Sequence, residues 1–212
     1  KGFHTRAVQL LRFSPDGELL LSFGLDDDNS LALHAWRHSR LLATSKVDKK
    51  NVLAAAWADR NCFYSAGSRH LKCWTVTGAS VRGAQVAWPG EKAEGVAALA
   101  GGGGAAFAGT ATGKLLTLRG ASVTHSCTGH TGPVFVLALA ADGTRLFSGG
   151  KDGAVFEWAV DERGLKQTRR LLAFTLADTP AIAVRSLDHH ADRLLVGTAG
   201  GDLWALGTDG QP

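Results

Sequence analysis

Three side chains in the later part of the chain have the types found in a hydrolytic triad: His130, Ser148 and Asp152. A histidine that an aspartate orients can take the proton of a serine hydroxyl, which is the basis of acyl transfer. The same residues, followed by Trp158, can instead form a buried hydrogen-bonded chain, because the serine can serve both the imidazole and the indole N–H. Ser148 lies in the sequence FSGGK, not in a G-x-S-x-G turn between a strand and a helix. We therefore expect a structural chain and no catalytic residues.

The segment that holds these residues is repeated along the chain, and each copy reads as the inner part of a small β-sheet. The copy RLFSGGKDGAVFEW, residues 145–158, matches RLLVGTAGGDLWAL, residues 193–206, without a gap. Weaker copies end at other bulky anchors, so that the five anchors are Trp36, Trp74, Leu118, Trp158 and Leu206. These anchors are 38, 44, 40 and 48 residues apart. The repeat is therefore close to the period of about 40–45 residues that is typical of four-stranded propeller blades.

Short apolar runs and turn signals support strands around each copy. An Asp-Gly pair ends SPDG at residues 14–17 and AADG at residues 140–143, and this pair between β-rich runs is a strong hairpin signal. The run from Val52 to Ala58 taken alone also fits a helix. A helix there, or at 133–140, would contradict the repeat. We predict an all-β fold, a β-propeller with about five four-stranded blades in an incomplete ring, whose units cover residues 1–48, 49–90, 91–128, 129–176 and 177–212.

Composition limits the function further. Hydrophobic residues are 45% and charged residues 20% of the 212, which is typical of a globular protein, and the glycine count of 27 suits a fold with many turns. No apolar stretch has the length of a membrane span. The three cysteines form no C-x-x-C motif, so we expect reduced thiols and no metal site, with a bridge between Cys62 and Cys73 as the less favoured alternative. The absence of methionine and the start at Lys1 suggest a piece of a longer protein.

The four residues His130, Ser148, Asp152 and Trp158 resemble the polar chain of a WD repeat. In the other units, the position six residues before the anchor is Ser30, Ser68, Thr112 or Gly200, so we expect those units to lack the chain.

A more specific resemblance is carried by SAGSRHLKCWTVTGASV, residues 65–81. It is similar to a pattern of the echinoderm-microtubule-associated-protein-like (EMAP-like) family, in which a histidine follows the turn and Thr-x-x-Gly follows the tryptophan. Other blades of that family are similar to residues 6–36, 129–158 and 183–206. The resemblance implies a non-enzymatic scaffold in the cytoplasm and on the cytoskeleton that binds tubulin or microtubules without a cofactor. The HELP motif and second propeller of the family are not seen in the chain.

Acidic tubulin tails would require a basic surface, and three groups of cations are candidates. One group lies between the first two units and includes Arg37, Arg40, Lys49 and Lys50. A second lies at the turn of the second unit and consists of Arg69, His70 and Lys72, and a third follows Trp158. The net charge of +4 is modest and basic residues do not alternate with aromatic ones, so we expect no nucleic-acid partner.

Two other functions remain open from the sequence. A generic WD-repeat adaptor, for example in a ubiquitin ligase or a ciliary complex, would share the fold and not the tubulin partner. An enzyme of the quinoprotein type is suggested by GTAGGDLWALGTDG, residues 197–210, which resembles repeats of quinone-dependent propellers. Only this repeat has that appearance, and no set of calcium-ligating carboxylates accompanies it.

Overall fold

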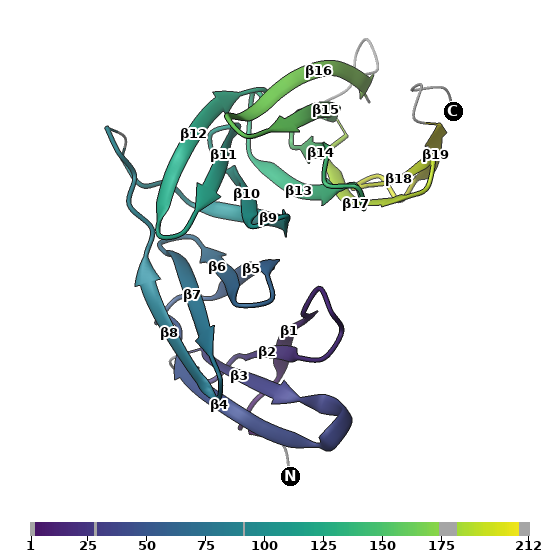
Figure 1. Ribbon diagram of the computed structural model, residues 1–212. Helices are drawn as coiled ribbons and strands as arrows, with labels where there is room; N and C mark the ends of the chain where they lie inside the picture. The colour runs from purple at the N-terminus through teal and green to yellow at the C-terminus, as the bar shows by residue number, and fades with distance from the viewer. Residues whose placement is uncertain (1–2, 28, 91, 174–181, 208–212) are drawn as a thin grey trace. The chain divides into compact units, whose positions relative to one another are not determined.

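The computed structural model describes residues 3–27, 29–90, 92–173 and 182–207. Strands follow one another in chain order and form five antiparallel sheets, as Figure 1 shows. The described residues contain no α-helix and a single 3₁₀ turn, η1 (Trp36–His38). No described helix is long and apolar enough to cross a membrane. The expected all-β fold with blade-like sheets is confirmed.

The first two sheets have four strands each, ordered as in the sequence. The first consists of β1 (Val8–Phe13), β2 (Leu20–Gly24), β3 (Ser30–Ala35) and β4 (Arg40–Lys46). The second consists of β5 (Val52–Asp59), β6 (Cys62–Gly67), β7 (Leu71–Thr77) and β8 (Ser80–Gln85). The run that also fitted a helix is therefore strand β5.

The third and fourth sheets also have four strands and the fifth has three. The third consists of β9 (Val96–Gly102), β10 (Ala105–Thr110), β11 (Lys114–Arg119) and β12 (Ser122–Thr128). The fourth consists of β13 (Val134–Leu139), β14 (Arg145–Gly150), β15 (Ala154–Asp161) and β16 (Gly164–Ala173). The fifth consists of β17 (Val184–His190), β18 (Arg193–Thr198) and β19 (Leu203–Gly207). Some residues of the expected units lie outside the described part of the chain. They are 1–2 and 28 in the first unit, 91 in the third, 174–176 in the fourth, and 177–181 and 208–212 in the fifth. The last three residues of the 197–210 motif are among them.

The chain forms two compact units. Unit 1 contains residues 1–106 and 118–123, and unit 2 contains residues 107–117 and 124–212, so the strands of the third sheet are divided between them. In unit 1, Phe63 stacks on Trp74 with ring centroids 5.8 Å apart, inside a core to which the first two sheets both contribute. In unit 2, the fourth and fifth sheets share a core that includes Phe147, Val155 and Val196. Each core thus forms between the apolar faces of neighbouring sheets, as in a propeller.

The Asp-Gly turns form as the sequence indicates. Gly17 and Gly143 have φ angles of 70° and 71°, in the left-handed region that glycine adopts without steric cost. At the first turn, the Ser14 hydroxyl and the Glu18 N–H both donate to Asp16, at 2.5 and 3.0 Å. These contacts fix the connections that bring polar side chains of different strands together.

Candidate functional site

The structure brings His130, Ser148, Asp152 and Trp158 together in one chain of hydrogen bonds. His130 Nδ1 lies 2.9 Å from Asp152 Oδ1, and His130 Nε2 lies 2.8 Å from Ser148 Oγ. The indole N–H of Trp158 donates to the same serine oxygen at 2.9 Å. Thr131 N–H adds a bond to Asp152 at 3.0 Å, which holds the aspartate against the loop that carries the histidine.

The direction of every proton in this chain follows from its two ends. The Asp152 carboxylate can only accept, so the proton of the neutral imidazole is on Nδ1 and is donated to Asp152. Nε2 then accepts the Ser148 hydroxyl proton, and the Trp158 indole N–H, which can only donate, donates to the Ser148 oxygen. Burial holds the pKa of His130 below its usual value despite the nearby carboxylate, so the neutral form that this chain requires is favoured at neutral pH. Burial raises the pKa of Asp152, but hydrogen bonds from His130 and Thr131 outweigh it and hold that pKa below its usual value.

The glycine before the histidine is part of the same arrangement. A Cβ built on Gly129 would overlap the six-membered ring of Trp158. The absence of a side chain at this position therefore lets the indole lie across the backbone that leads into His130.

A second polar chain lies in the first sheet, where the spacing of the sequence predicts none. His4 Nε2 lies 2.7 Å from Ser22 Oγ, and His4 Nδ1 lies 3.3 Å from Asp26 Oδ2 and 2.9 Å from Ser30 Oγ. Asp26 also accepts from the backbone N–H of Thr5 at 3.0 Å. The hydrogen bond that the Ser30 hydroxyl donates to Asp26, followed by those from the Thr5 hydroxyl and His4, holds the pKa of Asp26 well below its usual value. The expectation that only the fourth unit has such a chain was wrong.

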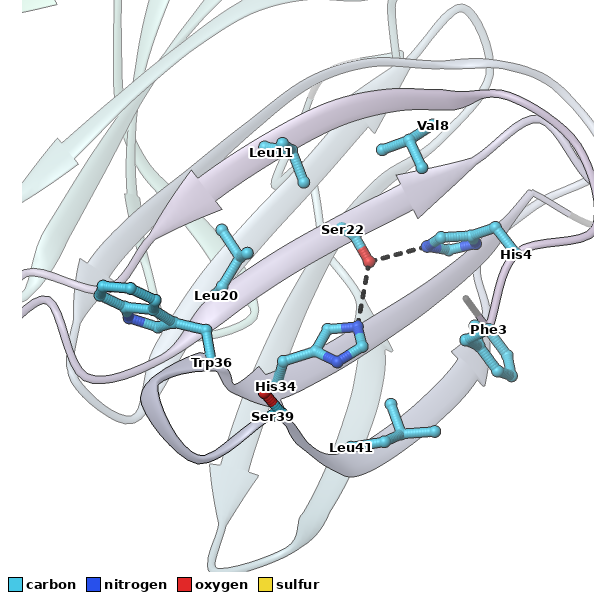
Figure 2. Close-up of a pocket in the computed structure, with 10 residues that line it drawn as sticks. All are labelled: Phe3, His4, Val8, Leu11, Leu20, Ser22, His34, Trp36, Ser39 and Leu41. Carbon is cyan, nitrogen blue, oxygen red and sulfur yellow. Dashed lines mark hydrogen bonds between the residues drawn. The ribbon is translucent and has the colours of Figure 1, made fainter. Parts of the chain in front are cut away.

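The anchor of the first sheet was also misassigned. His34 pairs with Leu20 as Trp158 pairs with Leu146, so His34, not Trp36, occupies the anchor position. His34 Nε2 faces Ser22 Oγ at 3.5 Å, in the place of the indole N–H (Figure 2). Trp36 lies in η1, 39% exposed, and donates to the Gly17 carbonyl.

A spacing in the sequence would have revealed this chain. The histidine precedes the serine by 18 residues and the aspartate by 22 in both sheets. The aspartate cannot be found by counting six residues back from the anchor, because the connection between β2 and β3 has two more residues than the connection between β14 and β15.

A cavity of about 550 Å³ lies over the polar chain of the first sheet (Figure 2). Its floor holds His4, Ser22 and His34, and apolar side chains such as Phe3, Leu11 and Leu41 surround them. An imidazole is smaller than the indole that fills the anchor position of the fourth sheet, which leaves space at this floor. The face around the cavity is unusually apolar, since Leu11 and Phe13 are 51% and 56% exposed.

The second sheet keeps half of the polar chain. Trp74 N–H donates to Ser65 Oγ at 2.9 Å. The imidazole comes from the other side of the turn: His70 lies beside Gly67, as His130 lies beside Gly150. His70 is only 2% exposed, so the expectation that it faces a partner from the surface was wrong. Among the described residues, neither of its ring nitrogens has a hydrogen-bond partner, and burial lowers its pKa.

The first group of basic residues does not form one patch. Arg37 and Arg40 lie before and at the start of β4, and Lys49 and Lys50 follow its end. The seven residues of this strand separate the two pairs by about 20 Å. Arg37 is further engaged, since it stacks on Trp36 at 4.8 Å and lies 3.8 Å from Glu18.

The cations that do lie together come from two groups. Lys72 Nζ donates to the Val47 carbonyl, which joins the linker before β5 to the hairpin of β6 and β7. Lys49, Lys50 and Arg69 are exposed at this junction, and they make no ion pair with any residue that the structure describes. We call these three residues and Lys72 the basic surface of the second sheet.

A protein-family model, "WD domain, G-beta repeat", matches residues 121–158, which include the complete polar chain of the fourth sheet. This segment is a WD40 repeat. The human echinoderm microtubule-associated protein-like 1 is 29% identical over 176 residues, which cover 79% of this chain and 22% of that protein. The actin-interacting protein 1 of Drosophila melanogaster is 29% identical over 171 residues, which cover 73% of this chain and 26% of that protein. The expected resemblance to EMAP-like proteins is confirmed, over about a quarter of the relatives' length.

A crystal structure of the computationally designed Ika8 protein has the same fold, with a TM-score of 0.70 and 20% identity. It aligns with 95% of this chain, which covers 58% of the designed protein. The likeness supports a propeller-type fold for the described chain, and the WD40 family match itself covers residues 121–158.

The polar chain of the WD40 repeat is built for rigidity rather than hydrolysis. Ser148 is fully buried, and its oxygen is hydrogen-bonded on both sides, so no acyl group can approach it. The described residues contain no cluster of three or more His, Cys, Asp or Glu side chains placed to hold a metal ion.

Proposed function

We propose that the chain is part of a non-enzymatic, cytoskeletal scaffold and that its basic surface binds the acidic tails of tubulin in microtubules. The observation that supports this proposal is that Lys49, Lys50 and Arg69 are exposed in the two segments joined by the Lys72–Val47 hydrogen bond, in a chain that resembles EMAP-like proteins. Buried polar chains in the first and fourth sheets stiffen the blades, and a stiff blade presents its loops without an ordering cost.

The charge of this surface determines how binding responds to salt. Exposed cations attract acidic peptides over a Debye length of about 10 Å at 0.1 M salt, and higher salt weakens the attraction. Binding through this surface should therefore decline steeply as ionic strength rises.

Cosedimentation of the 212-residue chain with microtubules tests the proposal. The triple variant Lys49→Glu, Lys50→Glu, Arg69→Glu should bind at least about tenfold more weakly at low salt. The matched control is the triple variant Lys151→Glu, Arg163→Glu, Lys166→Glu, which reverses three exposed cations in and around the fourth sheet. Equal loss in both variants would show general charge attraction and contradict a defined surface. No binding of the unmodified chain at low salt would overturn the tubulin proposal.

A second candidate partner is actin, because the actin-interacting protein 1 of Drosophila melanogaster is also similar to this chain. Cosedimentation with filamentous actin, run in parallel, distinguishes the two partners. Pelleting with actin and not with microtubules would favour this second function and would leave the scaffold reading intact.

A further inference from the structure

Two cysteines lie side by side in the second sheet. Cys62 Sγ and Cys73 Sγ are 3.5 Å apart, and both thiols are free. The pairing of β6 with β7 aligns Cys62 with Thr75 and Tyr64 with Cys73, so the two cysteines are diagonal neighbours on one face of the sheet. The third cysteine, Cys127, lies in β12 and is also free.

The two thiols differ in environment. Cys62 is half-buried and is the first residue of β6, whereas Cys73 lies inside β7 and is 6% exposed. The hydrogen bond between them lowers the pKa of Cys73 to about 7 and raises that of Cys62. Burial alone raises the pKa of Cys127 to about 11. Within this pair, the thiolate, which is the reactive form, is therefore favoured at Cys73 rather than at Cys62.

We propose that Cys62 and Cys73 form a redox-sensitive dithiol that hydrogen peroxide closes to an intramolecular disulfide. Closure brings the sulfur atoms from 3.5 Å to about 2.05 Å, a movement of about 1.5 Å. Because the backbone of Cys62 is paired with Asp59 on one side and Thr75 on the other, this movement is assigned to rotation of the two side chains.

The reaction balances with one peroxide molecule. The Cys73 thiolate attacks a peroxide oxygen and breaks the O–O bond, which yields a sulfenic acid and, after protonation, one water. The Cys62 sulfur then attacks the sulfenic sulfur, the S–O bond breaks, and a second water leaves. Two thiols are oxidised by two electrons and peroxide is reduced to two waters. A dithiol reductant reverses the closure.

The bridge would join the two strands of the hairpin whose turn carries Arg69. The inference itself does not depend on tubulin binding, because it rests on the geometry of the two sulfur atoms.

Peptide mapping tests the proposal directly. The folded chain is treated with hydrogen peroxide, its free thiols are alkylated, and it is digested with trypsin. Cleavage after Arg60, Arg69, Lys72 and Arg82 places Cys62 in peptide 61–69 and Cys73 in peptide 73–82. We expect these two peptides to appear linked, with a mass about 2 Da below their sum. Cys127 should remain open to alkylation after unfolding, and dithiothreitol should restore the separate peptides.

Variants and rates complete the test. Cys62→Ala and Cys73→Ala should each abolish the linked peptide, and Cys127→Ala should leave it unchanged. The dithiol should disappear at least about tenfold faster than Cys127 in the same sample. Linkage that forms only in denaturant, linkage through Cys127, or oxidation of Cys73 to sulfinic acid without a bridge would each overturn the proposal.

Discussion

Gly129 lies directly against the indole ring of Trp158, with no room for a side chain between them. Phe3 holds the corresponding position before His4 in the first sheet, where the anchor is His34. The two positions differ together between the sheets. In the fourth sheet glycine precedes the histidine and the anchor is the large indole of Trp158, and in the first sheet Phe3 precedes the histidine and the anchor is the smaller imidazole of His34. We therefore expect the residue before the histidine and the anchor to act as a matched pair in both sheets.

The first prediction concerns the glycine of this pair. Gly129→Ala should lower the free energy of unfolding by about 1–3 kcal/mol, because the new Cβ overlaps the Trp158 ring. Urea unfolding monitored by tryptophan fluorescence measures the change. Gly132→Ala is the control, since its Cβ would lie 3.5 Å from the nearest atom, an ordinary contact. Equal effects of the two substitutions would show that the Trp158 contact is not responsible.

The second prediction tests the matched pair in the first sheet. His34→Trp alone should destabilise the chain, because Phe3 stands where the fourth sheet has glycine. Adding Phe3→Gly should recover part of the loss, with a coupling energy of about 0.5–3 kcal/mol in a double-mutant cycle. Strict additivity of the two substitutions would contradict the pairing.

The third prediction concerns the serine at the centre of the buried chain. Ser148→Ala leaves the Trp158 N–H and His130 Nε2 without their shared partner, and should cost about 1–3 kcal/mol of unfolding free energy. Ser80→Ala, at an exposed position of β8, should change stability by less than about 0.5 kcal/mol. Chemical denaturation of both variants decides the matter. A neutral effect at Ser148 would mean that the polar chain contributes no net stability.

The fourth prediction contrasts two buried histidines. His130→Leu removes a hydrogen-bonded imidazole and leaves Asp152 and Ser148 without this partner. It should therefore lower the free energy of unfolding by about 2 kcal/mol or more. His70→Leu removes an imidazole without a partner among the described residues, so it should be neutral or stabilising within about 1 kcal/mol. Thermal unfolding of the two variants provides the comparison. A large loss for His70→Leu would reveal a partner for that ring.

The fifth prediction is a pH dependence. Burial lowers the folded-state pKa of His34, His70, His130 and His189. Below an ordinary histidine pKa of about 6.5, the unfolded chain binds more protons than the folded chain. The free energy of unfolding should therefore have its full value above that pH and fall as the pH drops below it, by up to about 1.4 kcal/mol per pH unit for a group such as His130. Urea titrations from pH 8 to pH 5 measure this slope, and it should be smaller in His70→Leu. A flat profile would contradict the neutral, buried state of these rings.

The sequence was informative wherever a repeat kept its spacing. The polar chain of the fourth sheet could be predicted as one cluster of residues, namely His130, Ser148, Asp152 and Trp158. Side chains alternate between the two faces of a strand and the turn between β14 and β15 is tight, so the spacing alone places them close together. The chain around His4 and Ser22 was missed because a longer turn shifted the count from the anchor, which is itself a different residue type.

The surface was harder to predict because strand length and side-chain direction decide it. Arg40 and Lys50 are close in sequence, but β4 places them at opposite ends of a blade. His70 follows two exposed turn residues, yet its ring turns inward over Gly67, where no side chain competes for the space. Neither outcome follows from residue type alone.

The histidine of each complete chain belongs to the linker before a sheet and not to a strand of that sheet: His4 precedes β1, and His130 precedes β13. A domain boundary drawn at the first strand of a sheet would thus separate the histidine from the serine and aspartate to which it is hydrogen-bonded. Any duplication or exchange of blades during evolution would have to carry the preceding linker along to preserve the bonds. The family match from residue 121 to residue 158 starts at the last strand of one sheet and ends in the third strand of the next. The sequence repeat is therefore offset from the folded sheet by one strand: it contains the last strand of one sheet and the first three strands of the next. Each repeat thus contributes strands to two successive sheets.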